Sequence, residues 1–218
     1  MITSYPTELI IPSELMRVIY VAAVVSALFL ERCQACTSIL VSKGASALNV
    51  SMCVHSADCG DCDSRIALVP NRKFNTTDLH PVRGIHHAFP REWSDRATVY
   101  FPPEGVEMDK PLGFIPEVNE TYAMWESVYG LMNEHGLTIG ESSTYARINS
   151  PGVDLENPNT HTKGPALFSI AMLIQVALER CKTVICAVTT MGSLSEKYGF
   201  YAETFNAGES LSIVEIVN

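Results

Sequence analysis

The sequence predicts an α+β fold, because its strand-like and helix-like segments are separated along the chain. Short β-rich runs come first, from residue 36 onward, and two apolar segments with helical periodicity follow between residues 165 and 198. Runs of strands followed by helices are typical of this class. With 47% hydrophobic and 18% charged residues among 218, the chain can bury a core, and we expect a single globular domain.

The first expected element is a hairpin. Residues 36–43 form a β-rich run, residues 44–49 a turn-like stretch, and residues 51–55 a second run. Residues 65–69 form a third apolar run. Residues 71–110 are rich in Pro, His and Arg with weak periodicity, so we expect a long surface excursion there.

A second hairpin is expected further along the chain. Residues 128–132 and 137–139 are apolar runs on either side of the Asn133-Glu134-His135-Gly136 turn, and residues 149–163 read as a loop.

Two helices complete the expected order of elements. The first runs from Pro165 to residue 183, with apolar residues at helical spacing and Arg180 in its last turn. The second covers residues 184–198 and ends near Gly199. No repeat, low-complexity tract or interdomain linker interrupts the chain.

The amino-terminal segment has the pattern of a secretory signal peptide. Arg17 provides a positive start, residues 18–30 are an unbroken apolar run, and Cys33 and Ala35 are small residues at the third and first positions before a cut. We therefore expect residues 1–35 to be a signal peptide, with Met16 as an alternative start. The run is shorter than the ~20 apolar residues of a membrane-spanning helix, so a permanent anchor is the weaker interpretation.

Other features fit a secreted protein and exclude some functions. The formal charge of −9 disfavours nucleic acid as a partner, because phosphates would be repelled. Three Asn-x-Ser/Thr acceptors support passage through a glycosylating, oxidising compartment. These acceptors begin at Asn49, Asn75 and Asn119.

Cysteines provide the candidates for disulfides and for chemistry. Seven are present, and Cys33 would leave with the signal peptide. If Cys36 is reserved for chemistry, five remain, so at least one stays free or pairs outside this chain. Cys59 and Cys62 form a single Cys-x-x-Cys motif, which is weak for zinc without further ligands and lacks the thioredoxin context. We expect a disulfide or another structural role for it.

Four stretches of the mature part resemble the dipeptidase A family of cysteine hydrolases, within the N-terminal-nucleophile superfamily that includes penicillin V acylase and acid ceramidase. They are CTSILVSKGAS at 36–46, HSADCGDCDSRIALVP at 55–70, PLGFIPEVNETYAMWESVYGLMNEHGLTIGESS at 111–143, and MGSLSEKYGFYAE at 191–203. This resemblance implies a four-layer αββα sandwich. It also implies hydrolysis of dipeptides.

The resemblance identifies Cys36 as the nucleophile, and the predicted cut after Ala35 independently makes Cys36 the first residue. A free α-amino group with a pKa near ~8 is well matched to take the proton of a thiol in the same residue. The sulfur would attack the peptide carbonyl, the α-ammonium would protonate the departing amine, and water would release a thioester intermediate. The alternative is an ordinary buried or disulfide-bonded cysteine.

The remaining site residues are carried over from the same resemblance. His55 and Asp58 align with an Arg and an Asp that contact the nucleophile in related hydrolases. Asp58 would orient the α-amino group, whereas His55 departs from the Arg common in the family and places a titrating ring where the family has a permanent cation. Asn133 is similar to an Asn that contributes to the oxyanion hole. Glu134 and Glu141 are expected to be structural or to lie at the substrate rim.

The expected partner is therefore a small peptide substrate. We expect no metal or organic cofactor and no stable membrane span, and both a monomer and an oligomer stay open. Two rivals stay open: an amidase or acylase that cleaves N-acyl amides, and an inactive secreted remnant that keeps its leader. The destination is the secretory route, either secreted or lysosomal/vacuolar. Family members are longer and the resemblance fades after Glu203, so we expect residues 36–218 to be the N-terminal part of the domain, with an incomplete sandwich and low activity alone.

Overall fold

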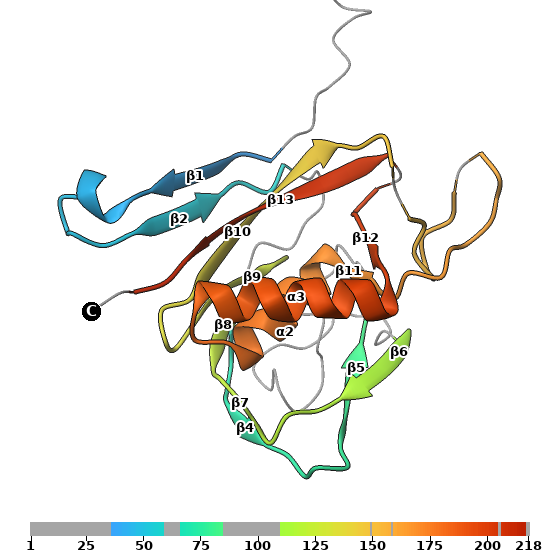
Figure 1. Cartoon of the computed structure of the whole chain (residues 1–218), viewed down its shortest axis with the longest axis horizontal. Coiled ribbons are helices and arrows are strands. Elements are labelled where there is room, and N and C mark those ends of the chain that lie inside the picture. Colours follow the sequence, from blue (N-terminus) through green and yellow to red (C-terminus); the bar gives the residue numbers. More distant parts are fainter. Residues whose placement is uncertain are drawn as a thin grey trace, which may run out of the picture. The chain divides into compact units, whose positions relative to one another are not determined.

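The computed structural model describes residues 36–58, 66–84, 110–148, 150–157, 159–204 and 206–216. They belong to one compact unit, Ala35–Asn218. The signal-peptide prediction and the Cys59-x-x-Cys62 motif lie outside the described residues. In those residues the architecture is mixed α+β, with an antiparallel five-stranded sheet and two helices, which confirms the predicted class (Figure 1).

The five-stranded sheet has the strand order β13-β10-β9-β8-β3. Its longest contact is the antiparallel pairing of β10 with β13, from Thr138 opposite Val214 to Tyr145 opposite Ala207. The strands are β3 (Ala67–Val69), β8 (Met124–Glu126), β9 (Gly130–Asn133), β10 (Thr138–Tyr145) and β13 (Ala207–Val214). The hairpin predicted around residues 133–136 is confirmed as β9 and β10.

A two-stranded hairpin packs on β10 and β13. It consists of β1 (Ser38–Val41), the short 3₁₀ helix η1 (Lys43–Ala45) and β2 (Met52–His55), as predicted (Figure 1). Small residues on β10 allow this close approach: a Cβ added at Gly140 would lie 2.6 Å from Cys53 Sγ. The Cys53 thiol donates a hydrogen bond to the Ser212 carbonyl (3.3 Å).

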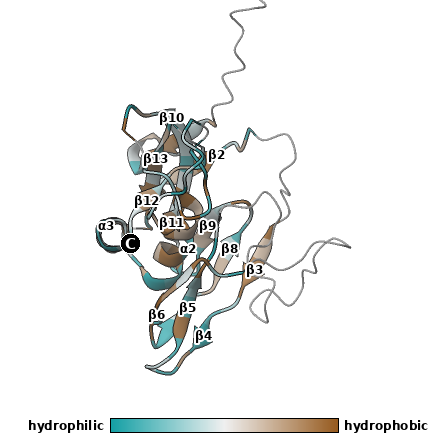
Figure 2. Cartoon of the chain, turned by 90° about the vertical axis from the view of Figure 1, so that its right-hand side faces the viewer, coloured by the Kyte–Doolittle hydropathy of each residue, from teal (hydrophilic) through white to brown (hydrophobic). Residues whose placement is uncertain are grey.

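The opposite face of the sheet meets the helices α2 (Ile170–Arg180) and α3 (Val184–Tyr198). Strand alternation places Ile139 on this face, and Ile139 belongs to the same buried core as α2. Every residue of α2 from Ile170 to Glu179 is buried, and all of them except Gln175 and Glu179 are apolar, as in a helix that lies inside the core (Figure 2). The hairpin and the helices therefore lie on opposite faces of β10.

The helix boundaries follow from capping. For α3, the Thr183 hydroxyl accepts from the Cys186 N–H, and the helix ends at Gly199, whose φ of 76° suits glycine; the predicted bounds are confirmed. For α2 the predicted start at Pro165 is wrong. The Ser169 hydroxyl caps the helix by accepting from the Met172 N–H. The preceding residues form strand β11 (Phe168–Ser169), which pairs with β12 (Phe200–Tyr201).

The predicted surface excursion at residues 71–110 is also corrected in part. It contains β4 (Arg72–Lys73) and β5 (Leu79–Val82), which pair with β7 (Glu120–Thr121) and β6 (Gly113–Pro116). Val82 and His80 are fully buried, so part of this polar stretch enters the interior. Residues 85–109 lie outside the described residues.

A disulfide joins Cys181 to Cys186 between the end of α2 and the first turn of α3. Cys36 and Cys53 are free thiols, and both are half-buried. The disulfide fixes the sharp connection between the two helices next to the fully buried Cys181.

Candidate active site around Cys36

The start of the β1–β2 hairpin is attached to β10 by side-chain hydrogen bonds. The Ser142 hydroxyl donates to the Cys36 carbonyl (2.5 Å), and the Ser38 hydroxyl donates to the Glu141 carbonyl (3.0 Å). Thr37 and Ser56 close the end of the hairpin, because the Ser56 N–H donates to the Thr37 carbonyl and the Thr37 N–H to the Ser56 hydroxyl. These bonds hold Cys36 beside β10.

Strand β10 extends beyond β9, which pairs with it at only one position. Met132 lies opposite Thr138, and β10 then continues to Tyr145. Beyond this point, the Glu141 carbonyl accepts the hydrogen bond from the Ser38 hydroxyl of the hairpin. The site therefore lies along the part of β10 that extends beyond its pairing with β9.

His55 reaches the same carbonyl. It lies opposite Ser38 in the hairpin register, and its ring forms a hydrogen bond to the Glu141 backbone. Its ring also contacts Tyr129 edge-on, with 5.6 Å between ring centroids. Burial lowers the pKa of His55 and outweighs the opposing effect of the Glu141 hydrogen bond. A neutral imidazole is therefore favoured, which differs from the permanent cation that an Arg would supply at this position.

Asp58 approaches Cys36 through its backbone, while its side chain is exposed. Burial raises the pKa of the Cys36 thiol; the Asp58 backbone hydrogen bond lowers it, and the charges of Glu141, Glu203 and Asp58 raise it further. The thiol is thus held in its protonated form and needs a base to become a nucleophile. The structure brings three predicted residues, Cys36, His55 and Asp58, to one place.

Asn133 does not belong to this group, and its expected role in an oxyanion hole is not supported by its contacts. Its Nδ2 donates to the carbonyls of Leu178 (2.8 Å) and Cys181 (2.7 Å). Its Oδ1 accepts from the N–H groups of His135 and Leu137, both at 3.1 Å. Both amide hydrogens are committed to the carboxyl end of α2, so no donor is left for an oxyanion. Asn133 joins the β9–β10 turn to the helix.

Two acidic residues lie on the strands that the hairpin packs against, and the charge of one of them, Glu141, raises the pKa of the Cys36 thiol. Glu141, expected to be structural or at the rim, is 0% exposed, and Glu209 is half-buried. They share a sheet face, because Glu209 lies opposite Ser143, two residues along the strand from Glu141. Glu134, expected to be structural or at the substrate rim, accepts a hydrogen bond from the Ala123 N–H at its Oε1 (2.9 Å).

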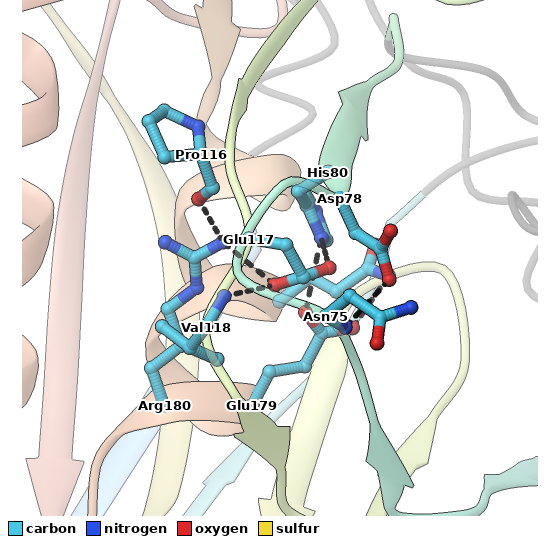
Figure 3. Close-up of polar contacts among 9 residues, drawn as sticks. Asn75, Asp78, His80, Pro116, Glu117, Val118, Glu179 and Arg180 are labelled. Atoms are coloured by element: carbon cyan, nitrogen blue, oxygen red, sulfur yellow. Dashed lines mark hydrogen bonds and ion pairs between the residues drawn. The ribbon is translucent and has the colours of Figure 1, made fainter.

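A second buried polar cluster lies between the β5–β6 hairpin and the end of α2 (Figure 3). His80 Nδ1 lies 3.0 Å from Glu117 Oε2 and 3.6 Å from Glu179 Oε2, and Arg180 Nη2 lies 3.0 Å from Glu117 Oε1. Burial raises the pKa of Glu117, but His80, the Val118 N–H and Arg180 outweigh it and hold the pKa at about 2. Among the described residues no nucleophilic side chain bonds to His80, so we interpret this cluster as structural.

A groove among the described residues is lined by no side chain of either cluster. It encloses about 490 Å³ against the outer side of β3, β8 and β9, and its apolar lining includes Leu68, Trp125 and Met132. Trp125 is therefore a wall residue of this groove. Of the predicted site residues, only Asn133 reaches this groove.

The described part of the chain contains no cluster of three or more His, Cys, Asp or Glu residues arranged to hold a metal ion. Nor does any helix in it have the length and hydrophobicity to cross a membrane. Comparison of the chain with protein-family models, with curated proteins and with solved structures finds no match.

Proposed function

We propose that this protein is a cysteine hydrolase of small peptides, in which removal of residues 1–35 makes Cys36 an N-terminal nucleophile. One observation carries the proposal: the β1–β2 hairpin, tied to β10 by the bond from the Ser142 hydroxyl to the Cys36 carbonyl and closed by the Thr37–Ser56 bonds, brings Cys36, His55 and Asp58 to the same end of the hairpin. The layers around them, hairpin on one face and helices on the other, are compatible with part of an αββα sandwich.

The raised pKa of the thiol supports a mechanism with an internal base. The α-amino group of processed Cys36 takes the thiol proton, and the sulfur bonds to the carbonyl carbon of the scissile peptide. The α-ammonium then passes its proton to the departing amine as the C–N bond breaks. Water attacks the resulting thioester, releases the acid and returns a proton to the sulfur. Asp58 is the residue assigned to orient the α-amino group.

Secretion is part of the same proposal. The asparagines of the three acceptor sequences, Asn49, Asn75 and Asn119, are exposed, so a glycosylating enzyme could reach them. The disulfide between Cys181 and Cys186 agrees with an oxidising compartment.

Hydrolysis of dipeptides, measured with a matched pair of variants, tests the function. Cys36→Ser removes the proposed nucleophile, and Cys53→Ser removes a second free, half-buried thiol of the described residues. We expect Cys36→Ser to lose more than ~100-fold in turnover, because a hydroxyl is much harder to deprotonate than a thiol. Cys53→Ser should keep turnover, and intact-mass measurement should detect an acyl group on Cys36. Equal activity of both variants would remove Cys36 from the mechanism.

The two rivals predict different results in the same assay. An N-acyl amide hydrolase would cleave N-acyl amino acids and leave dipeptides intact. An inactive remnant would cleave neither substrate and would carry residues before Cys36.

A further inference from the structure

The peptide unit between Cys36 and Thr37 is held by two serine side chains. Its carbonyl, on Cys36, accepts from the Ser142 hydroxyl of β10 (2.5 Å). Its N–H, on Thr37, donates to the hydroxyl of Ser56, the residue that follows β2 (3.1 Å). Because the peptide unit is planar, these bonds to its C=O and its N–H fix the orientation of the whole plane.

Both serines are themselves placed by strand pairing. Ser142 lies two residues after Gly140 on β10, so its side chain is on the same sheet face as Gly140, against which the hairpin packs. Ser56 and Thr37 exchange two bonds, because the Ser56 N–H also donates to the Thr37 carbonyl (2.9 Å). The two hydroxyls therefore come from elements whose positions do not depend on Cys36.

The held plane carries both reactive groups of processed Cys36. Its carbonyl carbon is bonded to the Cα that bears the α-amino nitrogen and the Cβ, so only rotations about Cα–C and Cα–Cβ remain to move the nitrogen and the sulfur. Both hydrogen bonds lie on the carboxyl side of Cys36, and a cut after Ala35 leaves them in place. A chain end is poorly ordered unless it is tied down, and a displacement of about 1 Å at a reacting group can cost ~100-fold in rate.

We propose that Ser142 and Ser56 are positioning residues, which hold the peptide unit after Cys36 and so keep its thiol and α-amino group in place for attack. This inference rests on the proposed role of Cys36. Ser142 has the larger share, because its bond is shorter and it joins the hairpin to the five-stranded sheet, whereas Ser56 is exposed and water can replace its hydroxyl. Neither serine exchanges a proton during the reaction.

Hydrolysis of L-alanyl-L-alanine per folded molecule tests the positioning role. Ser142→Ala should lower kcat at least ~10-fold and leave KM and the pH profile unchanged, because the lost bond orients the nucleophile and does not touch the substrate. Ser142→Thr keeps a hydroxyl and should restore most of the lost kcat. Ser56→Ala should lower kcat by a smaller factor, ~3-fold. Ser210→Ala is the matched control, because Ser210 is exposed directly opposite Ser142 on β13, and its kcat should equal that of the wild type.

Hydrogen exchange at the Thr37 amide provides a readout that needs no substrate, because this N–H is one of the two bound groups. It should exchange at least ~10-fold faster in Ser142→Ala than in the wild type or in Ser210→Ala.

A normal kcat in Ser142→Ala, with or without lower stability, would overturn the inference, as would unchanged exchange at Thr37 or a loss of kcat that Ser142→Thr does not restore. A wild type without hydrolysis that depends on Cys36 would refute the proposed function, whereas faster exchange in Ser142→Ala would still uphold the anchoring of the peptide unit. The two failures are therefore distinguishable.

Discussion

Replacement of Glu117 by Gln should destabilise the protein by about 3 kcal/mol at neutral pH. Glu117 is 2% exposed and bridges His80 and Arg180, at 3.0 Å from each. Its pKa falls from an ordinary value of 4.5 to about 2 in the folded protein, which corresponds to about 3 kcal/mol by linkage. The variant keeps the shape of the side chain and removes only the charge that Arg180 faces.

The sign of the pH dependence follows from the lowered pKa. The contribution is fully present above pH 4.5, where the unfolded carboxyl is ionised, and it is lost as the pH falls through about 2. Roughly half should be lost by pH 3. The stability difference between wild type and Glu117→Gln should therefore shrink from about 3 kcal/mol at pH 7 to about half of that at pH 3.

Urea unfolding followed by circular dichroism at pH 7, 5 and 3 measures this difference. Glu120→Gln is the control, because Glu120 is an exposed residue of β7. At pH 7 the melting temperature of Glu117→Gln should fall by roughly 10 °C, whereas that of the control should stay within 2 °C or so, about the effect of an ordinary surface change. A difference that is absent at pH 7, or that is equally large at pH 3, would refute the assignment of this cluster as a stabilising ion pair.

Three further changes test other parts of the structure. Asn133→Ala should lower the free energy of unfolding in urea by about 3 kcal/mol and leave turnover per folded molecule unchanged, because the side-chain amide donates to the Leu178 and Cys181 carbonyls. Lost turnover with normal stability would restore the oxyanion role. Gly140→Ala should lower the free energy of unfolding by about 1–3 kcal/mol, because the added methyl group would clash with the Cys53 sulfur. Adding Cys53→Ala should recover much of this loss, and losses that simply add would contradict the packing. Reduction of Cys181–Cys186 should lower the unfolding free energy by about 2 kcal/mol, and no change in denaturant midpoint would show that the bond is absent in solution.

Elements governed by local signals could be predicted from the sequence. The bounds of α3 follow from a capping Thr183 and a terminating Gly199, and the β1–β2 hairpin follows from two β-rich runs around a turn. The predicted start of α2 is too early, because the apolar residues after Pro165 fit a strand as well as a helix. The pairing of Phe168 with Phe200, a tertiary contact, decides in favour of a strand.

The candidate site was predictable to the extent that its residues are near one another in sequence. Cys36, His55 and Asp58 lie on one hairpin and come together by its register. The long-range partners could not be predicted in the same way. The contacts of Asn133 depend on α2, some 45 residues away. That Glu141 and Glu209 lie on one face of the sheet depends on the register of β10 and β13, although a carboxylate two residues after Ile139, on the same strand face, is a signal of a buried charge.

The most direct test of the account is the amino-terminal residue of the protein secreted by cells that express the full chain. Intact-mass measurement and N-terminal sequencing of the active fraction should give a chain that begins at Cys36, with the thiol and the α-amino group both unmodified. Cys36→Ser protein should begin at the same position, because the cut depends on the leader and not on the nucleophile. An active fraction that begins at Met1, Met16 or any residue other than Cys36 would contradict the N-terminal-nucleophile mechanism.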